Sequence, residues 1–73
     1  MAARPESVMR NEHYDIVSVL YHSLQGAETC ERYIKDAEQE GDQEVVEFLH
    51  QVQEQNLQLA EKAKRLLAAR VSA

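Results

Sequence analysis

The feature that most constrains the fold is a helical repeat of apolar residues between Val45 and Leu67, interrupted by one polar residue. Apolar side chains advance there in alternating steps of three and four residues, which is the spacing of one helix face. The members of this stripe are Val45, Leu49, Val52, Leu59, Ala63 and Leu66, with Asn56 in the one gap. Because such a helix must lay its stripe against another helix, the pattern predicts an all-α fold.

The preceding segment carries a matching stripe, and only two residues join it to the second. The stripe residues and their apolar neighbours are Ile16, Leu20, Ala27 and Ile34, flanked by Val17, Leu24, Cys30 and Ala37. Gly41 is expected to end the first helix in the left-handed conformation, and Asp42 to cap the second helix. So short a connection predicts an antiparallel two-helix hairpin with helices over about 12–40 and 43–69.

The ends of the chain are expected to lie outside the helices. Residues 1–10 contain Pro5 and show no periodicity, which is typical of a flexible N-terminal arm. Asn11 is the expected N-cap of the first helix. Residues 71–73 are expected to fray, so the hairpin domain is assigned to residues 11–70.

Size and composition predict that the hairpin has a partner. A chain of 73 residues buries little apolar surface alone, and its one cysteine, Cys30, excludes an intrachain disulfide. Two hairpins packed face to face would form a four-helix bundle and cover the apolar residues that one helix contact leaves exposed. We therefore predict a homodimer, although the same stripes also fit a tetramer. The expected interface residues are Leu20, Leu24, Val45, Leu49, Val52, Asn56, Leu59 and Leu66.

The charge balance narrows the classes of partner. Thirteen acidic and eight basic residues give a formal net charge of −5, which disfavours nucleic acid and anionic membranes. The basic residues near the end of the chain also suit the negative end of a helix dipole. No segment resembles a signal peptide or a membrane span. A cytoplasmic protein is expected.

Some residues are unusual for their place on the helix faces. Asn56 interrupts the apolar stripe, where a paired amide can fix helix register or oligomeric state, or contact a ligand. Gly26 lowers helix propensity and predicts either a close helix contact or a kink. Glu31 falls beside Leu20 and Leu24 on the helical wheel, so it needs a polar partner, a metal ion or a path to solvent.

One short motif could carry chemistry. Glu47 and His50 form a Glu-x-x-His pair, and residues three apart on a helix can reach the same metal ion. If the stripe that begins at Val45 faces inward, however, both side chains point about 140 to 160° away from it, at 100° per residue. In that orientation they are ordinary surface residues.

A longer pattern resembles a known family. It comprises Leu24-Gln25-Gly26-Ala27-Glu28, Tyr33, Ala37, Gly41-Asp42 and Val45-Val46-Glu47-Phe48. Over about residues 14–67 this pattern resembles the helical hairpin of small bacterial ferritin-like and rubrerythrin-like proteins. The resemblance implies a four-helix bundle and, in the iron-binding members, a di-iron site, for which Glu31 or Glu28, Glu47 and His50 would be the candidates.

These observations favour a protein without catalytic activity. The chain has no Gly-rich phosphate loop, and it has no nucleophile paired with a base. We predict a small helical assembly or protein-interaction module without a cofactor. It would bind a second copy of itself and an unidentified protein partner. The alternative is a ferritin-like, iron-binding or redox protein assembled as a dimer of hairpins.

Overall fold

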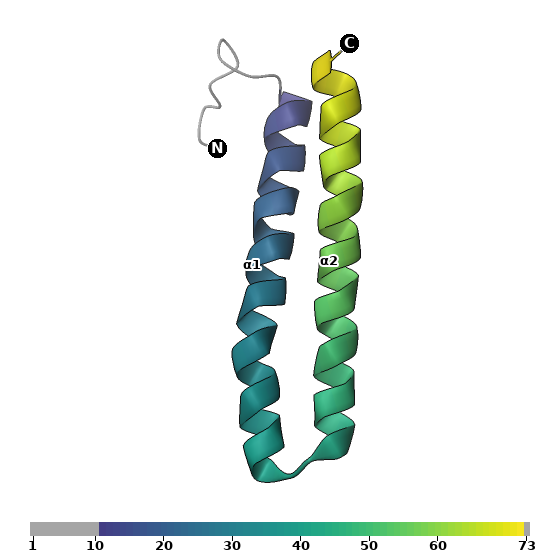
Figure 1. The fold of residues 1–73 in the computed structure, drawn as a ribbon. Coiled ribbons are helices and arrows are strands. Elements are labelled where there is room, and N and C mark those ends of the chain that lie inside the picture. The colour runs from purple at the N-terminus through teal and green to yellow at the C-terminus, as the bar shows by residue number, and fades with distance from the viewer. Residues whose placement is uncertain (1–10, 73) are drawn as a thin grey trace.

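The chain folds into two long antiparallel helices, which confirms the predicted all-α hairpin (Figure 1). The structure, a computed structural model, describes residues 11–72, and the expected N-terminal arm at residues 1–10 lies outside them. Helix α1 spans Asn11–Glu40 and helix α2 spans Gln43–Ser72, with 30 residues in each. The structure extends α2 to Val71 and Ser72, two residues past the expected hairpin boundary at residue 70, and no glycine or proline after Gly41 interrupts the helix.

The turn between the helices has the predicted chemistry. Gly41 adopts a φ of +74°, which is favourable for glycine and strained for other residues. The amide of Gly41 donates to the carbonyl of Glu38 and that of Asp42 to the carbonyl of Ala37, each over 3.1 Å, which forms a Schellman motif. A carboxylate oxygen of Asp42 accepts a hydrogen bond from the amide of Val45 over 3.3 Å. Asp42 is therefore the N-cap of α2, as predicted.

The two helices meet along a seam with a seven-residue repeat. On both helices the buried and half-buried positions recur in steps of three and four, which is the pattern of an antiparallel coiled coil. The seam consists of Ile16, Leu20, Ser23, Ala27, Cys30, Ile34 and Ala37 on α1, and of Val46, Leu49, Gln53, Asn56, Ala60, Ala63 and Leu67 on α2. Near the turn, Ile34, Ala37, Val46 and Leu49 form one apolar cluster.

On α2 the packing face is rotated from the stripe expected from the sequence. We expected Val45, Leu59 and Leu66 to pack in the stripe, but these side chains are 40%, 52% and 38% exposed. Val46 and Ala60, each one residue further along, are only 5% and 3% exposed. Two seven-residue repeats run along α2, one beginning at Val45 and the other at Val46. The repeat that begins at Val46 contains Ala60 and faces α1, because small side chains let the helices approach closely.

The same explanation applies to one residue on α1. Leu24, an expected interface residue, is 46% exposed in the single hairpin. Its neighbours Ser23 and Ala27 are buried in the seam instead. Small residues therefore fill the middle of the hairpin, and larger aliphatic residues lie to either side of it.

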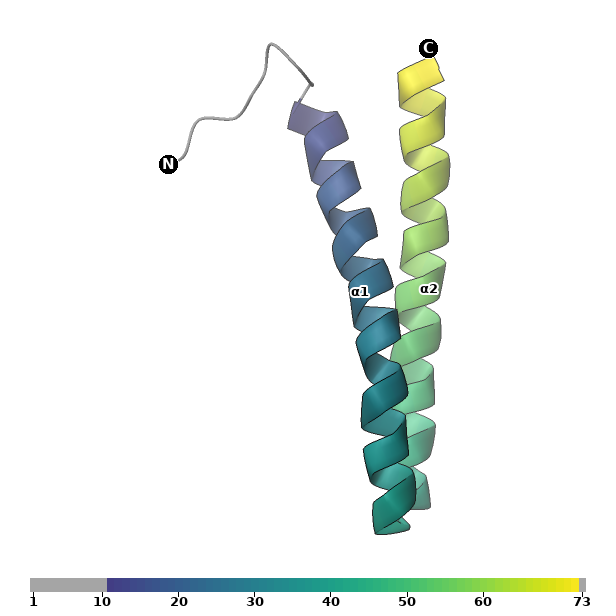
Figure 2. The ribbon, with the colours of Figure 1, turned by 60° about the vertical axis from the view of Figure 1, so that its left-hand side comes forward.

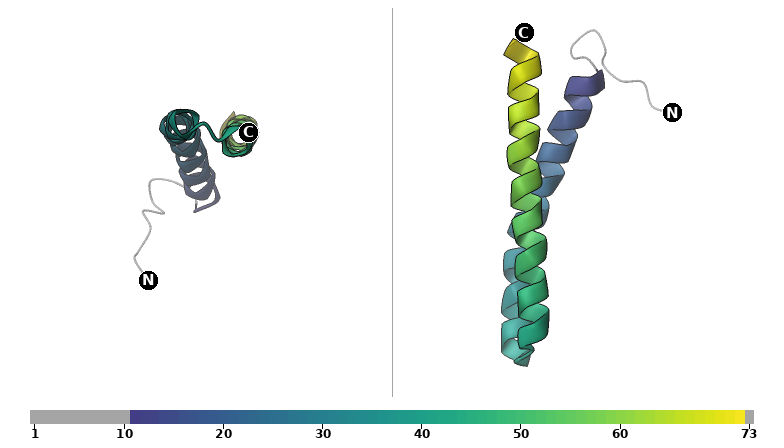
Figure 3. Two further views of the ribbon diagram at one scale, coloured as in Figure 1. Left: turned by 90° about the horizontal axis from the view of Figure 1, so that it is seen from below. Right: turned by 90° about the vertical axis from the view of Figure 1, so that its right-hand side faces the viewer.

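The hairpin is one helix layer thick. Seen along its axis, α1 and α2 lie side by side and account for all of the described residues except the turn (Figure 3, left). Two side views show α1 tilted across α2, so that the helices diverge toward the end that contains Asn11 and Ser72 (Figure 2; Figure 3, right). We call this the open end and the other the turn end. Among the described residues, neither helix is apolar enough over a sufficient length to cross a membrane.

Candidate functional site

Six large apolar side chains line one side of the hairpin, and we call this surface the apolar flank. On α2 its members recur every seven residues, so they share one helix face. The flank comprises Val19 and Tyr33 on α1 and Val45, Val52, Leu59 and Leu66 on α2. Five of the six are between 38% and 52% exposed, and Val52 is half-buried. The structure thus places four expected interface residues, Val45, Val52, Leu59 and Leu66, on a surface that one hairpin leaves uncovered.

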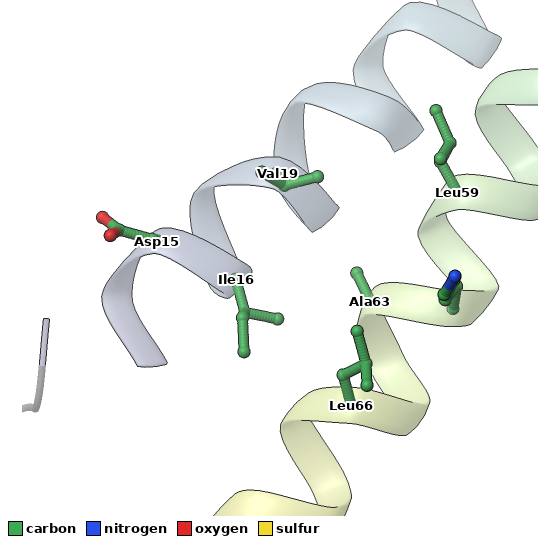
Figure 4. A pocket seen from close by; sticks show the side chains of 7 residues that line it. Asp15, Ile16, Val19, Leu59, Ala63 and Leu66 are labelled. Atoms are coloured by element: carbon green, nitrogen blue, oxygen red, sulfur yellow. The ribbon is translucent and has the colours of Figure 1, made fainter. Parts of the chain in front are cut away.

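At the open end, the apolar flank is hollowed into a groove. Ile16 and Val19 of α1 face Leu59, Ala63 and Leu66 of α2 across a space of about 260 Å³ (Figure 4). The groove exists because the helices diverge here, so these aliphatic side chains line its walls without filling it. Asp15 and Lys62 complete the lining. Such a groove can accept an apolar side chain from another helix.

At the turn end, the same flank is acidic. Tyr33, Val45 and Leu49 line a second hollow together with three carboxylates, and that hollow has no basic residue in its lining. The carboxylates are Asp36, Glu40 and Asp42. One apolar surface therefore joins a groove lined by one acidic and one basic residue to a hollow lined by three acidic residues.

The opposite side of the hairpin also exposes large apolar side chains. Leu24 and Leu57 lie together there, in a shallow hollow that also includes Glu28, Glu31 and Gln53. Leu57 is 43% exposed, which makes it comparable to Leu59 two residues further along α2. Because these two leucines lie on opposite sides of one helix, they form a matched pair for testing which side is covered.

Polar side chains occupy the middle of the seam. The Nδ2 atom of Asn56 lies so close to Gly26 that a methyl group on that glycine would approach it to 2.8 Å. Gly26 therefore permits a close helix contact, one of the two roles predicted from the sequence. The amide of Gln53 donates to the carbonyl of Ala27 over 3.0 Å and links the two helices. Among the described side chains, every buried polar atom has a hydrogen-bond partner.

The metal-site candidates do not come together in one copy. Glu31, Glu47 and His50 are all exposed. Between residues 11 and 72, no three histidine, cysteine or acidic side chains lie close enough to hold a metal ion. The residues present in one hairpin therefore do not fit the donor set of a di-iron centre, which needs inward-facing carboxylates and imidazoles.

The apolar pattern of the sequence did not identify several residues of the seam and of the apolar flank. Gln53 and Ser23 occupy seam positions, but polar residues do not register in a search for apolar stripes. Phe48, at 60% exposure, belongs to the apolar residues beyond the narrow stripe that predict a partner, but the sequence did not place it beside a groove. The recurrence of Ala60, Gln53 and Val46 at seven-residue intervals was a signal that could have located the seam.

Comparison of the chain with protein-family models, with curated proteins and with solved structures found no match. The resemblance to ferritin-like hairpins therefore stays a prediction.

Proposed function

We propose that this protein is a non-catalytic helical assembly module that pairs with a second copy of itself through the apolar flank. The observation that carries the proposal is the line of aliphatic side chains on α2, in which Val45, Leu59 and Leu66 are exposed and Val52 is half-buried. Monomeric proteins seldom expose an apolar surface of this kind. A second hairpin on this surface would complete a four-helix bundle.

The composition of the seam supports the need for a partner. Of the described apolar side chains that are buried, four are alanines, and Ile34 and Val46 are the large aliphatic ones. Burying a large aliphatic side chain contributes about 1.5–3 kcal/mol, whereas a methyl group contributes much less. By contrast, twelve large apolar side chains among the described residues are more than a third exposed. Most of the large apolar side chains in the described part of the chain therefore lie outside the buried seam.

The proposal is tested by placing one charge on each side of α2. Leu59→Lys puts an ammonium group on the apolar flank, and Leu57→Lys puts the same group on the opposite side. Both leucines are about half exposed, at 52% and 43%, so neither substitution buries a charge within one hairpin. Helix content by circular dichroism is the control for folding.

We expect light scattering to give a dimer for the unmodified protein and for Leu57→Lys, and a monomer for Leu59→Lys. A dimer for both variants, or a dimer lost only with Leu57→Lys, would contradict the assignment of the apolar flank. A monomer in all three proteins would refute self-association itself.

A further inference from the structure

We propose that the second copy lies on the apolar flank with its turn at the opposite end, so that Phe48 of each copy packs against the open-end groove of the other. The inference rests on the self-association proposed above and adds its orientation and its anchor residue. Two hairpins can meet face to face about a two-fold axis in two ways, with their turns at the same end or at opposite ends. The charge, the repeat and the groove each bear on the choice between them.

Charge is distributed very unevenly along the hairpin. The turn half, residues 27–56, carries nine acidic and two basic side chains. The open half, residues 11–26 and 57–72, carries three acidic and four basic side chains. If the turns met at the same end, two strongly acidic halves would repel each other. With the turns at opposite ends, each acidic half meets an open half of slightly positive charge.

The same contrast is present on the flank itself. The turn-end hollow is lined by the carboxylates of Asp36, Glu40 and Asp42, and no basic side chain lines it. The open-end groove has one acidic and one basic residue in its lining, Asp15 and Lys62, and the structure shows no ion pair of Lys62 among the described residues. In the opposite-end arrangement, this ammonium group approaches the acidic end of the other copy. Complementary charge of this kind selects one orientation of docking.

The repeat on α2 is compatible with an antiparallel pairing of two copies. Val45, Val52, Leu59 and Leu66 are evenly spaced, so reversing one helix superimposes the four positions on themselves. Val45 then lies level with Leu66 of the second copy, and Val52 lies level with Leu59. The two-fold axis passes between Gln55 and Asn56. Asn56, half-buried on this side of the seam, is then close to its counterpart in the second copy.

This register brings Phe48 to the groove. Phe48 lies three residues after Val45, at the edge of the apolar flank, and is 60% exposed. In the antiparallel pairing it lies level with Ala63 of the second copy, which lines the open-end groove beside Leu59 and Leu66. The aromatic ring can fill a space that the diverging helices leave open (Figure 4). By symmetry, each dimer has two such contacts.

Distances between spin labels on the two copies test the orientation. Cys30 is replaced by alanine, and the full chain is labelled through a new cysteine at Gln43 or at Gln58, both of which are exposed. With 25 residues between Gln43 and the position level with its counterpart, opposite ends separate the Gln43 labels by about 38 Å along the helix axis at 1.5 Å per residue, whereas turns at the same end place them within about 30 Å. Labels at Gln58, close to the axis, lie within about 30 Å in either face-to-face dimer.

A long distance at residue 43 together with a short one at residue 58 supports the proposal. Short distances at both positions would overturn the opposite-end orientation and leave the dimer itself intact. Absence of any intermolecular distance at both positions would refute the proposed self-association as well.

Phe48→Ala tests the anchor separately. We expect the dissociation constant of the dimer to rise at least about tenfold, which is typical of an aromatic anchor. The matched control is Tyr21→Ala, because Tyr21 is equally exposed, at 60%, and shares a helix face with Leu24 on the opposite side. Equal effects of the two substitutions, or no effect of Phe48→Ala, would overturn the role of Phe48.

Discussion

The contact between Gly26 and Asn56 gives a quantitative test of how the helices pack. Gly26→Ala adds one methyl group inside α1, where alanine is favoured over glycine by about 1 kcal/mol. The added carbon would lie 2.8 Å from Nδ2 and 3.4 Å from Cγ of Asn56. The nearest atom is the end of a flexible side chain, so the asparagine must turn away from its present position.

The two effects nearly cancel in the unmodified background. Turning a side chain by about 30° from its rotamer costs of the order of 0.5–1.5 kcal/mol, which is close to the gain in helix propensity. We therefore expect Gly26→Ala to change the free energy of unfolding by less than about 0.5 kcal/mol. In the Asn56→Ala background the obstacle is absent, so the same substitution should stabilise by about 1 kcal/mol.

A double-mutant cycle measures this difference directly. Urea unfolding of the four proteins at one protein concentration gives the coupling energy between the two positions, which we expect to be about 1 kcal/mol. In thermal unfolding the corresponding shift in Tm is about 4–8 °C. Equal stabilisation by Gly26→Ala in both backgrounds would show that Gly26 and Asn56 do not touch and would refute the register of the hairpin.

Three further predictions concern the turn and the seam. Gly41→Ala places a side chain at a φ of +74°, where no other atom lies within 4 Å of the added carbon, so the cost is that of the backbone alone, about 1–2 kcal/mol in thermal unfolding; an unchanged Tm would contradict the left-handed turn. Asp42→Ala removes the acceptor for the amide of Val45 and should destabilise by about 0.5–2 kcal/mol, whereas Asp42→Asn should retain most of the stability, as chemical denaturation would show. The thiol of Cys30 is 3% exposed, so alkylation by iodoacetamide should be slow in the native protein and fast in urea, and rapid native labelling would argue against its place in the seam.

Local signals in the sequence were sufficient to predict the hairpin. Gly41 and Asp42 specify the end of one helix and the start of the next through backbone chemistry that depends on a few neighbouring residues. An apolar stripe with helical spacing begins at Ile16 before this turn, and another begins at Val45 after it. Two such helices joined by so short a turn must pack antiparallel. The structure confirms each of these elements.

The rotation of α2 could not be derived from the apolar pattern alone. Val45 and Val46 are adjacent and chemically identical, and each begins a seven-residue repeat. Which repeat faces α1 depends on how closely the helices approach, and that distance is set by Ala60 and Ala27 together with the fit of Asn56 over Gly26. Such complementarity involves both helices at once, so a wheel drawn for one helix does not contain it.

The apolar flank was partly predictable for a related reason. The excess of apolar residues indicated that something covers the hairpin, and Val45, Leu59 and Leu66 were among the residues expected at an interface. The groove beside Ile16 arises from the divergence of the helices, which is a property of the folded pair. The uneven distribution of charge was present in the sequence, but only the fold shows which charged residues belong to the turn half and which to the open half of the hairpin.

The most direct test of self-association is the native mass spectrum of the untagged protein, purified from cells grown with added iron and zinc. We predict a species of twice the chain mass of 8.4 kDa, without a metal adduct. A dimer that carries two metal ions would instead favour the ferritin-like alternative and direct attention to Glu31, Glu47 and His50. A monomer over the concentrations at which the protein is soluble would contradict the central claim that a second copy covers the apolar flank.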